Sequence, residues 1–225
     1  MFKTETHLHV SEVSPCSQLS AAEMVERYHK AGYKTLVVSD HFQAGYFDSL
    51  GDLSWDEKID TFLIGYHKVK AAAEKVSMNS ILAAEIQLKG SCNHYLLYGI
   101  DEAFLKKCPT MLEMNVETFY PYAKQHGITV IQAHPYRDNA CNPTPEFVDG
   151  FEVYNSNPRH ENFTSRAIET AQQYHKPMTA GSDAHRIEDI AHSGVITEQE
   201  IRTADDYIRM FYNNELQLIM GDSKE

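Results

Sequence analysis

Side chains that commonly bind metal ions occur in four short motifs spread along the sequence. They are His7-Leu8-His9, Asp40-His41, His134-Pro135 and Asp183-Ala184-His185. Each motif ends or follows a run of aliphatic and β-branched residues that is typical of a β-strand. Residues two apart in a strand point to the same side, so His7 and His9 can converge on one point, and so can Asp183 and His185. The spacing predicts a cluster of metal ligands where several strands end.

Two further ligand-type residues lie near strand ends. Glu85 ends one expected strand, whereas His94 begins another, so its place in the strand supports it less. Taken singly, a histidine at a strand edge usually packs or faces solvent, and Asp183 could simply cap a helix. Their joint occurrence favours a metal centre, because half of the chain's 12 histidines belong to the set: His7, His9, His41, His94, His134 and His185.

The elements that must position these residues alternate between strands and helices. Alternating or continuous apolar runs predict strands at 2–9, 34–39, 80–85, 95–99, 128–133, 150–154, 177–182 and 194–196. Helical periodicity predicts helices at 20–31, 56–76, 114–126, 162–175 and 203–213. Repetition of a strand followed by a helix is typical of an α/β fold with a parallel sheet. In such folds the active site lies at the carboxyl ends of the strands, where the motifs fall.

Composition limits the class of protein. The 225 residues suit one domain spanning 1–225, because no linker, repeat or low-complexity tract divides them. The formal net charge of −12 disfavours nucleic acid as a partner. No apolar stretch is long enough to span a membrane, and the first residues lack an apolar signal region. Four cysteines without a C-x-x-C pair complete the expectation of a reduced, soluble, cytoplasmic protein.

The order of the motifs resembles that of the PHP (polymerase and histidinol phosphatase) superfamily. The likeness covers roughly residues 3–190 and includes His-x-His at 7–9, Ser-Asp-His at 39–41, Glu85, His134-Pro135 and Gly-Ser-Asp-Ala-His at 181–185. The segment Glu152-Val-Tyr-Asn155 is also similar to one that the family places after its sixth strand. The resemblance implies a TIM-like, distorted (β/α)7 barrel of PHP type that holds two to three divalent ions.

The resemblance also implies which residues hold each ion. The first ion would take His7, His9, Glu85 and Asp183, and the second would take Glu85, His94 and His134. The third would take His41 and His185, together with an acidic residue or histidine at a place where this chain has Ser14 and Pro15. Glu12 is the nearest acidic substitute, and Cys16 is the alternative. Mixed imidazole and carboxylate ligands favour Zn, Mn or Fe over Mg.

The activity implied is that of a hydrolase, a metal-dependent phosphatase acting on a small phosphorylated metabolite through a metal-bound hydroxide. Histidinol phosphate is the best single guess for the substrate. Glu85 would bridge two ions, and Asp40 would bond a ligand or the attacking water, or transfer a proton. Arg186 and Arg159 would bind the substrate phosphate. Arg137 is a weaker candidate, because many such arginines only pair with surface acids.

Two alternatives belong to other classes of function. A nuclease or nucleotide phosphodiesterase of PHP type is disfavoured by the net charge and by the absence of a basic stripe. A non-catalytic regulatory PHP module should show gaps among its ligands, and the only gap is at the third ion.

Overall fold

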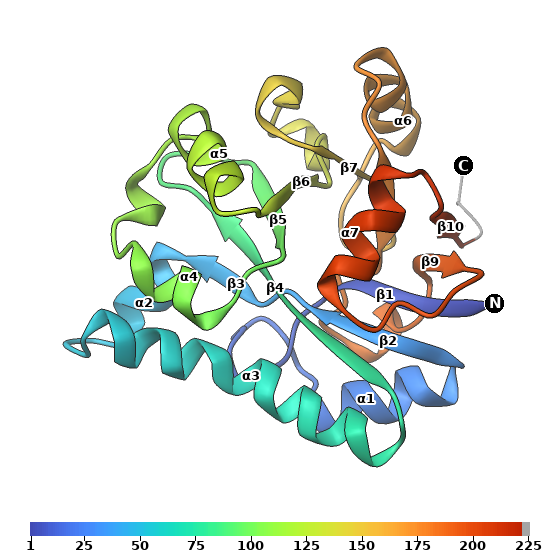
Figure 1. The fold of residues 1–225 in the computed structure, drawn as a ribbon, viewed down its shortest axis with the longest axis horizontal. Coiled ribbons are helices and arrows are strands. Elements are labelled where there is room, and N and C mark those ends of the chain that lie inside the picture. Colours follow the sequence, from blue (N-terminus) through green and yellow to red (C-terminus); the bar gives the residue numbers. More distant parts are fainter. Residues whose placement is uncertain (222–225) are drawn as a thin grey trace.

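A sheet that curls almost into a barrel forms the centre of the molecule (Figure 1), in a computed structural model that describes residues 1–221. Within the described residues, seven neighbouring strands make up its curved part: β1 (Phe2–Leu8), β2 (Tyr33–Val38), β4 (Asn79–Gln87), β5 (His94–Tyr98), β6 (Thr129–Ala133), β7 (Gly150–Asn155) and β8 (Met178–Gly181). A bridge between Leu8 and Ala184 joins the end of β1 to the segment after β8. The predicted TIM-like barrel of seven strands is confirmed.

One strand of the barrel runs against the others. β5 is antiparallel to both β4 and β6, whereas β1, β2 and β4 are mutually parallel, as are β6, β7 and β8. The expectation of a purely parallel sheet is therefore wrong at β5. The short connection from Gln87 to His94 explains the reversal, since a parallel crossover needs a dozen or more residues. As a result, the first residue of β5 lies at the same edge as the last residues of β4 and β6.

Short strands extend the sheet beyond the barrel. β3 (His41–Gln43) pairs with β4, β9 (Ser193–Thr197) pairs with β1, and β10 (Gln217–Met220) pairs with β9. The sequence did not predict β3 or β10, because strands of three or four residues show too little alternation to be recognised.

Helices cover the outer face of the sheet, and α1 and α3 lie side by side below it in Figure 1. The predicted helices correspond to α1 (Ala21–Lys30), α3 (Trp55–Lys75), α5 (Val116–Gln125), α6 (Thr164–Gln173) and α7 (Ala204–Tyr212). The short helices α2 (Ala44–Ser49) and α4 (Glu102–Lys107) were not predicted. A capping box of Ser20 and Glu23 begins α1, as their spacing indicates.

The inner faces of these helices carry apolar side chains at helical spacing, and these side chains are buried. On α7, Tyr207, Met210 and Phe211 are all buried, and the Tyr207 ring stacks on Tyr98 of β5 with 4.4 Å between ring centres. Gly181 is a point of very close approach between strands, because a Cβ there would lie 2.5 Å from the His7 Cβ. Among the described residues, no helix is both long and apolar enough to cross a membrane.

One pair of cysteines does not have the reduced state that the sequence predicts. Cys92 and Cys141 form a disulfide, so the prediction of a fully reduced chain is wrong here. Cys92 precedes β5 and Cys141 follows β6, and the antiparallel pairing of these strands brings the two residues together. Cys16 and Cys108 are free thiols.

Candidate metal centre

The first predicted group of ligands meets where β1 ends beside the segment after β8. The Nε2 atoms of His7 and His9 lie 3.1 Å apart, as expected for residues that alternate along one strand. Asp183 Oδ1 is 3.2 Å from His9 Nε2 and 3.6 Å from His7 Nε2. All three side chains are almost fully buried. The structure thus brings together residues separated by most of the sequence.

Glu85 lies at the middle of the site. Its Oε1 is 2.9 Å from His94 Nδ1 and 3.0 Å from His134 Nε2. Its Oε2 is 2.7 Å from His41 Nδ1 and 3.6 Å from His9 Nε2. Oε2 is buried and accepts no hydrogen bond with acceptable geometry from the described residues. A buried carboxylate oxygen without such a bond, surrounded by imidazole nitrogens, is suited to a divalent cation, so this donor set fits the ions that the motifs imply.

His94 reaches this group because β5 is reversed. In the register of the sheet, His94 lies opposite Gln87 of β4 and Ala133 of β6. An imidazole at the start of β5 therefore points into the same site as Glu85 at the end of β4.

A third group of nitrogens lies at the open side of the cluster. His41 Nε2 and His185 Nε2 face one another at 3.2 Å, and ligand atoms of His9, His41 and His185 all lie within 4.8 Å of each other. The Cys16 thiol lies near His185 and His41. Burial alone would raise the pKa of this thiol, but its interactions with these two histidines outweigh burial and lower the pKa to about 6.

Glu12 does not join this group, which contradicts the expectation that it supplies the missing ligand. Its Oε2 accepts a hydrogen bond from the Ala21 backbone N–H at 3.0 Å, and its Oε1 lies 3.7 Å from Lys68 Nζ. An acidic side chain near the first turn of a helix is stabilised by the helix dipole and by unpaired N–H groups. Glu12 is therefore held at the start of α1.

Two of the candidate ligands have left-handed backbone conformations. The φ angles are +29° at His134 and +50° at Asp183. Such values are uncommon for residues other than glycine, and His134 also precedes a proline, which restricts it further. Strained backbone that persists at a cluster of polar side chains is typical of functional sites.

A second layer of polar side chains holds the ligands in place. Glu152 Oε1 is 2.9 Å from His7 Nδ1, and Glu152 Oε2 accepts hydrogen bonds from the His134 N–H and from Asn155 Nδ2. A partner on one imidazole nitrogen fixes which nitrogen faces the ion. Glu152 and Asn155 were quoted in the sequence only as part of a similar segment. The signal that could have assigned Glu152 this role is a lone carboxylate on the inner face of a strand that is otherwise apolar.

Asp40 lies behind the metal ligands and is not among the residues that line the pocket described below. Its Oδ1 accepts hydrogen bonds from Ser14 Oγ at 2.7 Å and from the Val10 N–H at 2.9 Å. Ser14 Oγ lies 3.4 Å from His9 Nδ1, so Asp40 is linked to His9 through Ser14. Burial raises the pKa of Asp40 to about 7. Its position suits a role in orienting His9.

Charges around the two carboxylates favour their ionised forms. Burial would raise the pKa of Glu85, but the histidines around it, His94 first, hold that pKa well below its usual range. Burial would likewise raise the pKa of Asp183, but Arg137 and His7 hold it well below. Both side chains are therefore anionic at neutral pH and available as metal ligands.

Two of the buried histidines have lowered pKa values. Burial and the nearby charge of Arg137 lower the pKa of His134 to about 4. Burial, together with His41 and His185, also lowers the pKa of His9 well below its ordinary value. Neutral imidazoles have a lone pair to offer, so both residues suit metal ligation at neutral pH.

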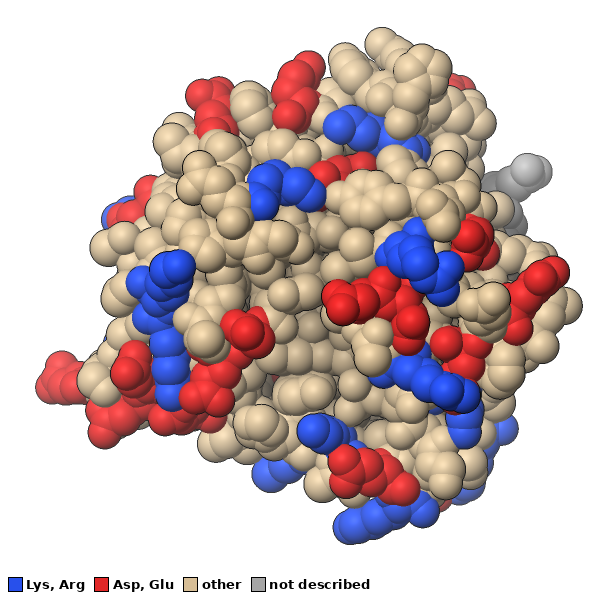
Figure 2. All heavy atoms as spheres, viewed as in Figure 1, with Lys and Arg blue, Asp and Glu red and all other residues tan. Residues whose placement is uncertain are grey.

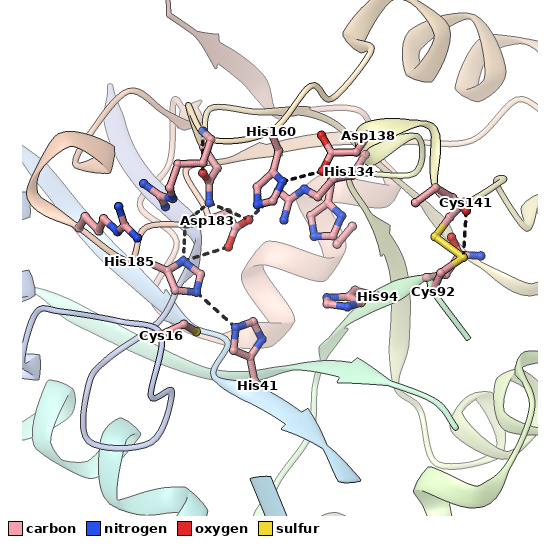
Figure 3. A pocket seen from close by; sticks show the side chains of 17 residues that line it. Cys16, His41, Cys92, His94, His134, Asp138, Cys141, His160, Asp183 and His185 are labelled. Atoms are coloured by element: carbon pink, nitrogen blue, oxygen red, sulfur yellow. Dashed lines mark hydrogen bonds and ion pairs between the residues drawn. A yellow bond between two sulfur atoms is a disulfide. The ribbon is translucent and has the colours of Figure 1, made fainter. Parts of the chain in front are cut away.

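A pocket of about 380 Å³ opens over the cluster and is lined by three arginines (Figure 3). Arg137 Nη2 lies 2.6 Å from Asp183 Oδ2, so it pairs with a candidate ligand and not with a surface acid as expected. Arg159 forms a two-pronged ion pair with the buried Asp189, at 2.7 and 2.8 Å. Arg186 is the least committed of the three, because its Nε has no hydrogen-bond partner among the described residues.

Comparisons with known proteins found one matching family model and several solved structures with a similar fold. The family model described as PHP-associated (PHP_C) matches residues 161–211. No curated protein sequence matches the chain.

Solved structures with the same fold have low sequence identity to the chain. A two-domain protein from Bacteroides vulgatus, described as containing a predicted PHP-like metal-dependent phosphoesterase, has a TM-score of 0.71 and 15% identity; the match covers 98% of this chain but 65% of that one. A putative metal-dependent phosphoesterase from Bifidobacterium adolescentis has a TM-score of 0.56 and 13% identity, with 96% and 97% covered. An amidohydrolase from Chromobacterium violaceum, solved with bound sulfate and no metal, has a TM-score of 0.56 and 14% identity, with 84% and 90% covered.

The barrel and the order of the ligand motifs are those expected of a PHP-type fold. The PHP-associated family model, over residues 161–211, and the solved structures show that the chain is similar to proteins of this class.

Proposed function

We propose that this protein is a metal-dependent phosphoesterase that hydrolyses a small phosphorylated metabolite, with histidinol phosphate as the best single candidate. The observation that carries the proposal is the placement of Glu85. Its buried carboxylate lies between two groups of imidazoles, with His134 Nε2 3.0 Å from one oxygen and His41 Nδ1 2.7 Å from the other, and both of these histidines line the pocket.

Two to three divalent ions, of Zn, Mn or Fe, would be held by the clustered side chains. The residues that would hold them are His7, His9, Glu85, His94, His134, Asp183, His41 and His185. Bound there, the ions would acidify a water molecule and neutralise charge on the phosphate.

The protein's own side chains would bind and orient the substrate. Arg186 lines the pocket, and its guanidinium has only a long contact, 3.9 Å from Nη1 to Glu188 Oε1, so it could turn to bind two phosphate oxygens. Arg159 would act by positioning. Its partner Asp189 accepts hydrogen bonds from the backbone N–H groups of His185 and Arg186, both at 2.8 Å, and thereby fixes the segment that carries them.

The comparisons and the surface charge support this choice over the alternatives. Two of the similar structures are named as phosphoesterases, and the amidohydrolase binds sulfate, which is a tetrahedral anion like phosphate. On the face drawn in Figure 2, basic and acidic side chains are intermingled and the basic ones form no continuous stripe. A nuclease needs such a stripe to follow a phosphate backbone.

The test begins with elemental analysis of protein purified without added metal. Phosphate release is then measured from histidinol phosphate, mononucleotides and short oligonucleotides at several salt concentrations. We expect turnover of small monoesters with shallow salt dependence. Steeply salt-dependent digestion of oligonucleotides, beside negligible monoester turnover, would instead identify a nuclease. Metal binding without turnover of any of these would point to a regulatory module.

Replacement of Arg186 tests the phosphate contact. We expect Arg186→Ala to lower kcat/KM by roughly 10- to 100-fold, as expected for the loss of a charge-assisted hydrogen bond, with metal content unchanged. Arg202→Ala is the matched control, since Arg202 pairs with Glu200 outside the pocket. Equal activity of the two variants would exclude Arg186 from substrate binding.

A further inference from the structure

The loop after β1 places a sulfur atom beside two histidines. Cys16 lines the pocket together with His41 and His185, whose Nε2 atoms face each other at 3.2 Å. Figure 3 shows the Cys16 side chain next to both rings, at the side of the pocket opposite Cys92 and Cys141. Three potential donor atoms thus come from three segments that are distant in sequence.

Backbone contacts hold this loop against the site. The Gln18 N–H donates to the His185 carbonyl at 2.8 Å. Ser17 Oγ donates to the His9 carbonyl at 3.0 Å and lies 3.3 Å from the His185 carbonyl. The residues next to Cys16 are therefore tied to the same segments that carry the histidines, so its position does not depend on a free loop.

Other residues of the loop are engaged elsewhere or have no donor. Glu12 is bound at the start of α1. Ser14 Oγ donates to Asp40 Oδ1 at 2.7 Å and accepts from the His41 N–H at 3.2 Å, and Pro15 offers no ligand atom. Among residues 11–19, Cys16 is the residue that lines the pocket together with the two histidines.

We infer that the Cys16 thiolate is a ligand of the third ion, together with His41 and His185. The inference rests on the metal centre of the proposed function and assigns one further residue to it. The metal would bind the thiolate, and the fraction of the thiol that is still protonated would release its proton to solvent on binding. A set of one thiolate and two imidazoles selects Zn²⁺, Co²⁺ or Fe²⁺ and disfavours Mg²⁺ and Mn²⁺.

Substitution by cobalt tests this assignment, because a Co²⁺–thiolate bond gives a charge-transfer absorption band in the near ultraviolet. We expect the cobalt-loaded protein to show the band, Cys16→Ser to lose both the band and one equivalent of cobalt, and Cys16→Asp to lose the band but keep the cobalt. Cys108→Ser is the matched control, because Cys108 is the other free cysteine and lies outside the pocket. The cobalt-loaded Cys108→Ser protein should show the same absorption band as wild type.

A second measurement follows the thiol directly. Zinc should protect Cys16 from alkylation by iodoacetamide, as measured by mass spectrometry of the peptide that contains it, and should leave Cys108 unprotected. A band that is absent from the cobalt-loaded protein, or that persists in Cys16→Ser, would overturn the assignment, as would alkylation of Cys16 that zinc does not slow. None of these readouts depends on phosphate release, so failure of the proposed activity and failure of the Cys16 assignment are distinguishable.

Discussion

At the scale of single residues, Glu85 connects the groups of the site. Its two oxygens face different imidazoles, with His94 and His134 on one side and His41 on the other. Because its pKa is held well below the usual range, the carboxylate is available to two cations at once at neutral pH.

Removing the charge of Glu85 should therefore affect the whole site. We expect Glu85→Gln to lower bound metal and to abolish phosphate release together, while circular dichroism shows an intact fold. Glu113→Gln is the matched control, since Glu113 forms an ion pair with Lys89 at the surface. A Glu85→Gln protein that stays active and keeps all its metal would refute the bridging role.

Asp40 gives a prediction about pH. Its folded-state pKa of about 7 lies above the value of ~3.9 typical of an unfolded chain, so folding favours the protonated form. The stability that this proton contributes is complete below about pH 4 and is lost as the pH rises to about 7. We expect wild type to lose up to about 4 kcal/mol relative to Asp40→Asn across this range.

The measurement is urea unfolding of both proteins, treated with a chelator, at several pH values. The difference between the two free energies of unfolding isolates Asp40 from the other titrating groups. A difference that stays constant from pH 4 to pH 7 would contradict the raised pKa.

At the scale of elements, the site depends on strands that approach one another very closely. Gly181 of β8 leaves no room for a side chain, because a Cβ would lie 2.5 Å from the His7 Cβ and 2.6 Å from Glu152 Oε1. Both neighbours belong to the metal centre or its supporting layer, so packing and ligand geometry are coupled here.

Gly181→Ala should disturb both properties. We expect a loss of about 1–3 kcal/mol in unfolding free energy, as for other overpacked positions, and weaker zinc binding. Gly45→Ala in α2 is the control, because a Cβ at that position would have no heavy atom within 4 Å. Calorimetry for stability and a zinc titration for affinity would check the prediction, and unchanged zinc affinity in the Gly181→Ala protein would contradict it.

The helices and strands also show how much of the fold and of the site could be predicted from the sequence. Alternation and helical periodicity predicted the longer strands and helices, and the ligand types at strand ends predicted the cluster itself, with His7, His9 and Asp183 meeting as expected. The reversal of β5 was missed, because the direction of a strand depends on its connections and not on its own residues. Glu12 was assigned by nearness in sequence, whereas the hydrogen bond to Ala21 directs it to the start of α1.

At the scale of the whole molecule, the candidate ligands come from nearly every strand of the barrel. Ions bound among them would connect β1, β4, β5, β6 and the segment after β8, and would stabilise the folded state because the unfolded chain holds no such site.

Adding a chelator should therefore lower the thermal stability of the metal-loaded protein. We expect Tm to fall on treatment with EDTA and to recover when Zn²⁺ is restored in excess, as measured by scanning calorimetry. Glu85→Gln should respond much less, because it begins with less metal. A Tm that EDTA leaves unchanged in wild type would show that the ions contribute nothing to folding.

The bridge between Leu8 and Ala184 has a consequence for the order in which the protein assembles. The hairpin of β4 and β5 joins neighbours in the chain, so Glu85 and His94 can meet early, when little conformational freedom has been lost. Leu8 and Ala184 lie near opposite ends of the sequence, and their contact requires that almost everything between them has already folded. We therefore expect the seam of the barrel, along which His7, His9 and Asp183 lie, to close late. In a nascent chain, Glu85 and His94 can meet during synthesis, whereas His7 and His9 can meet Asp183 only after residue 183 has left the ribosome.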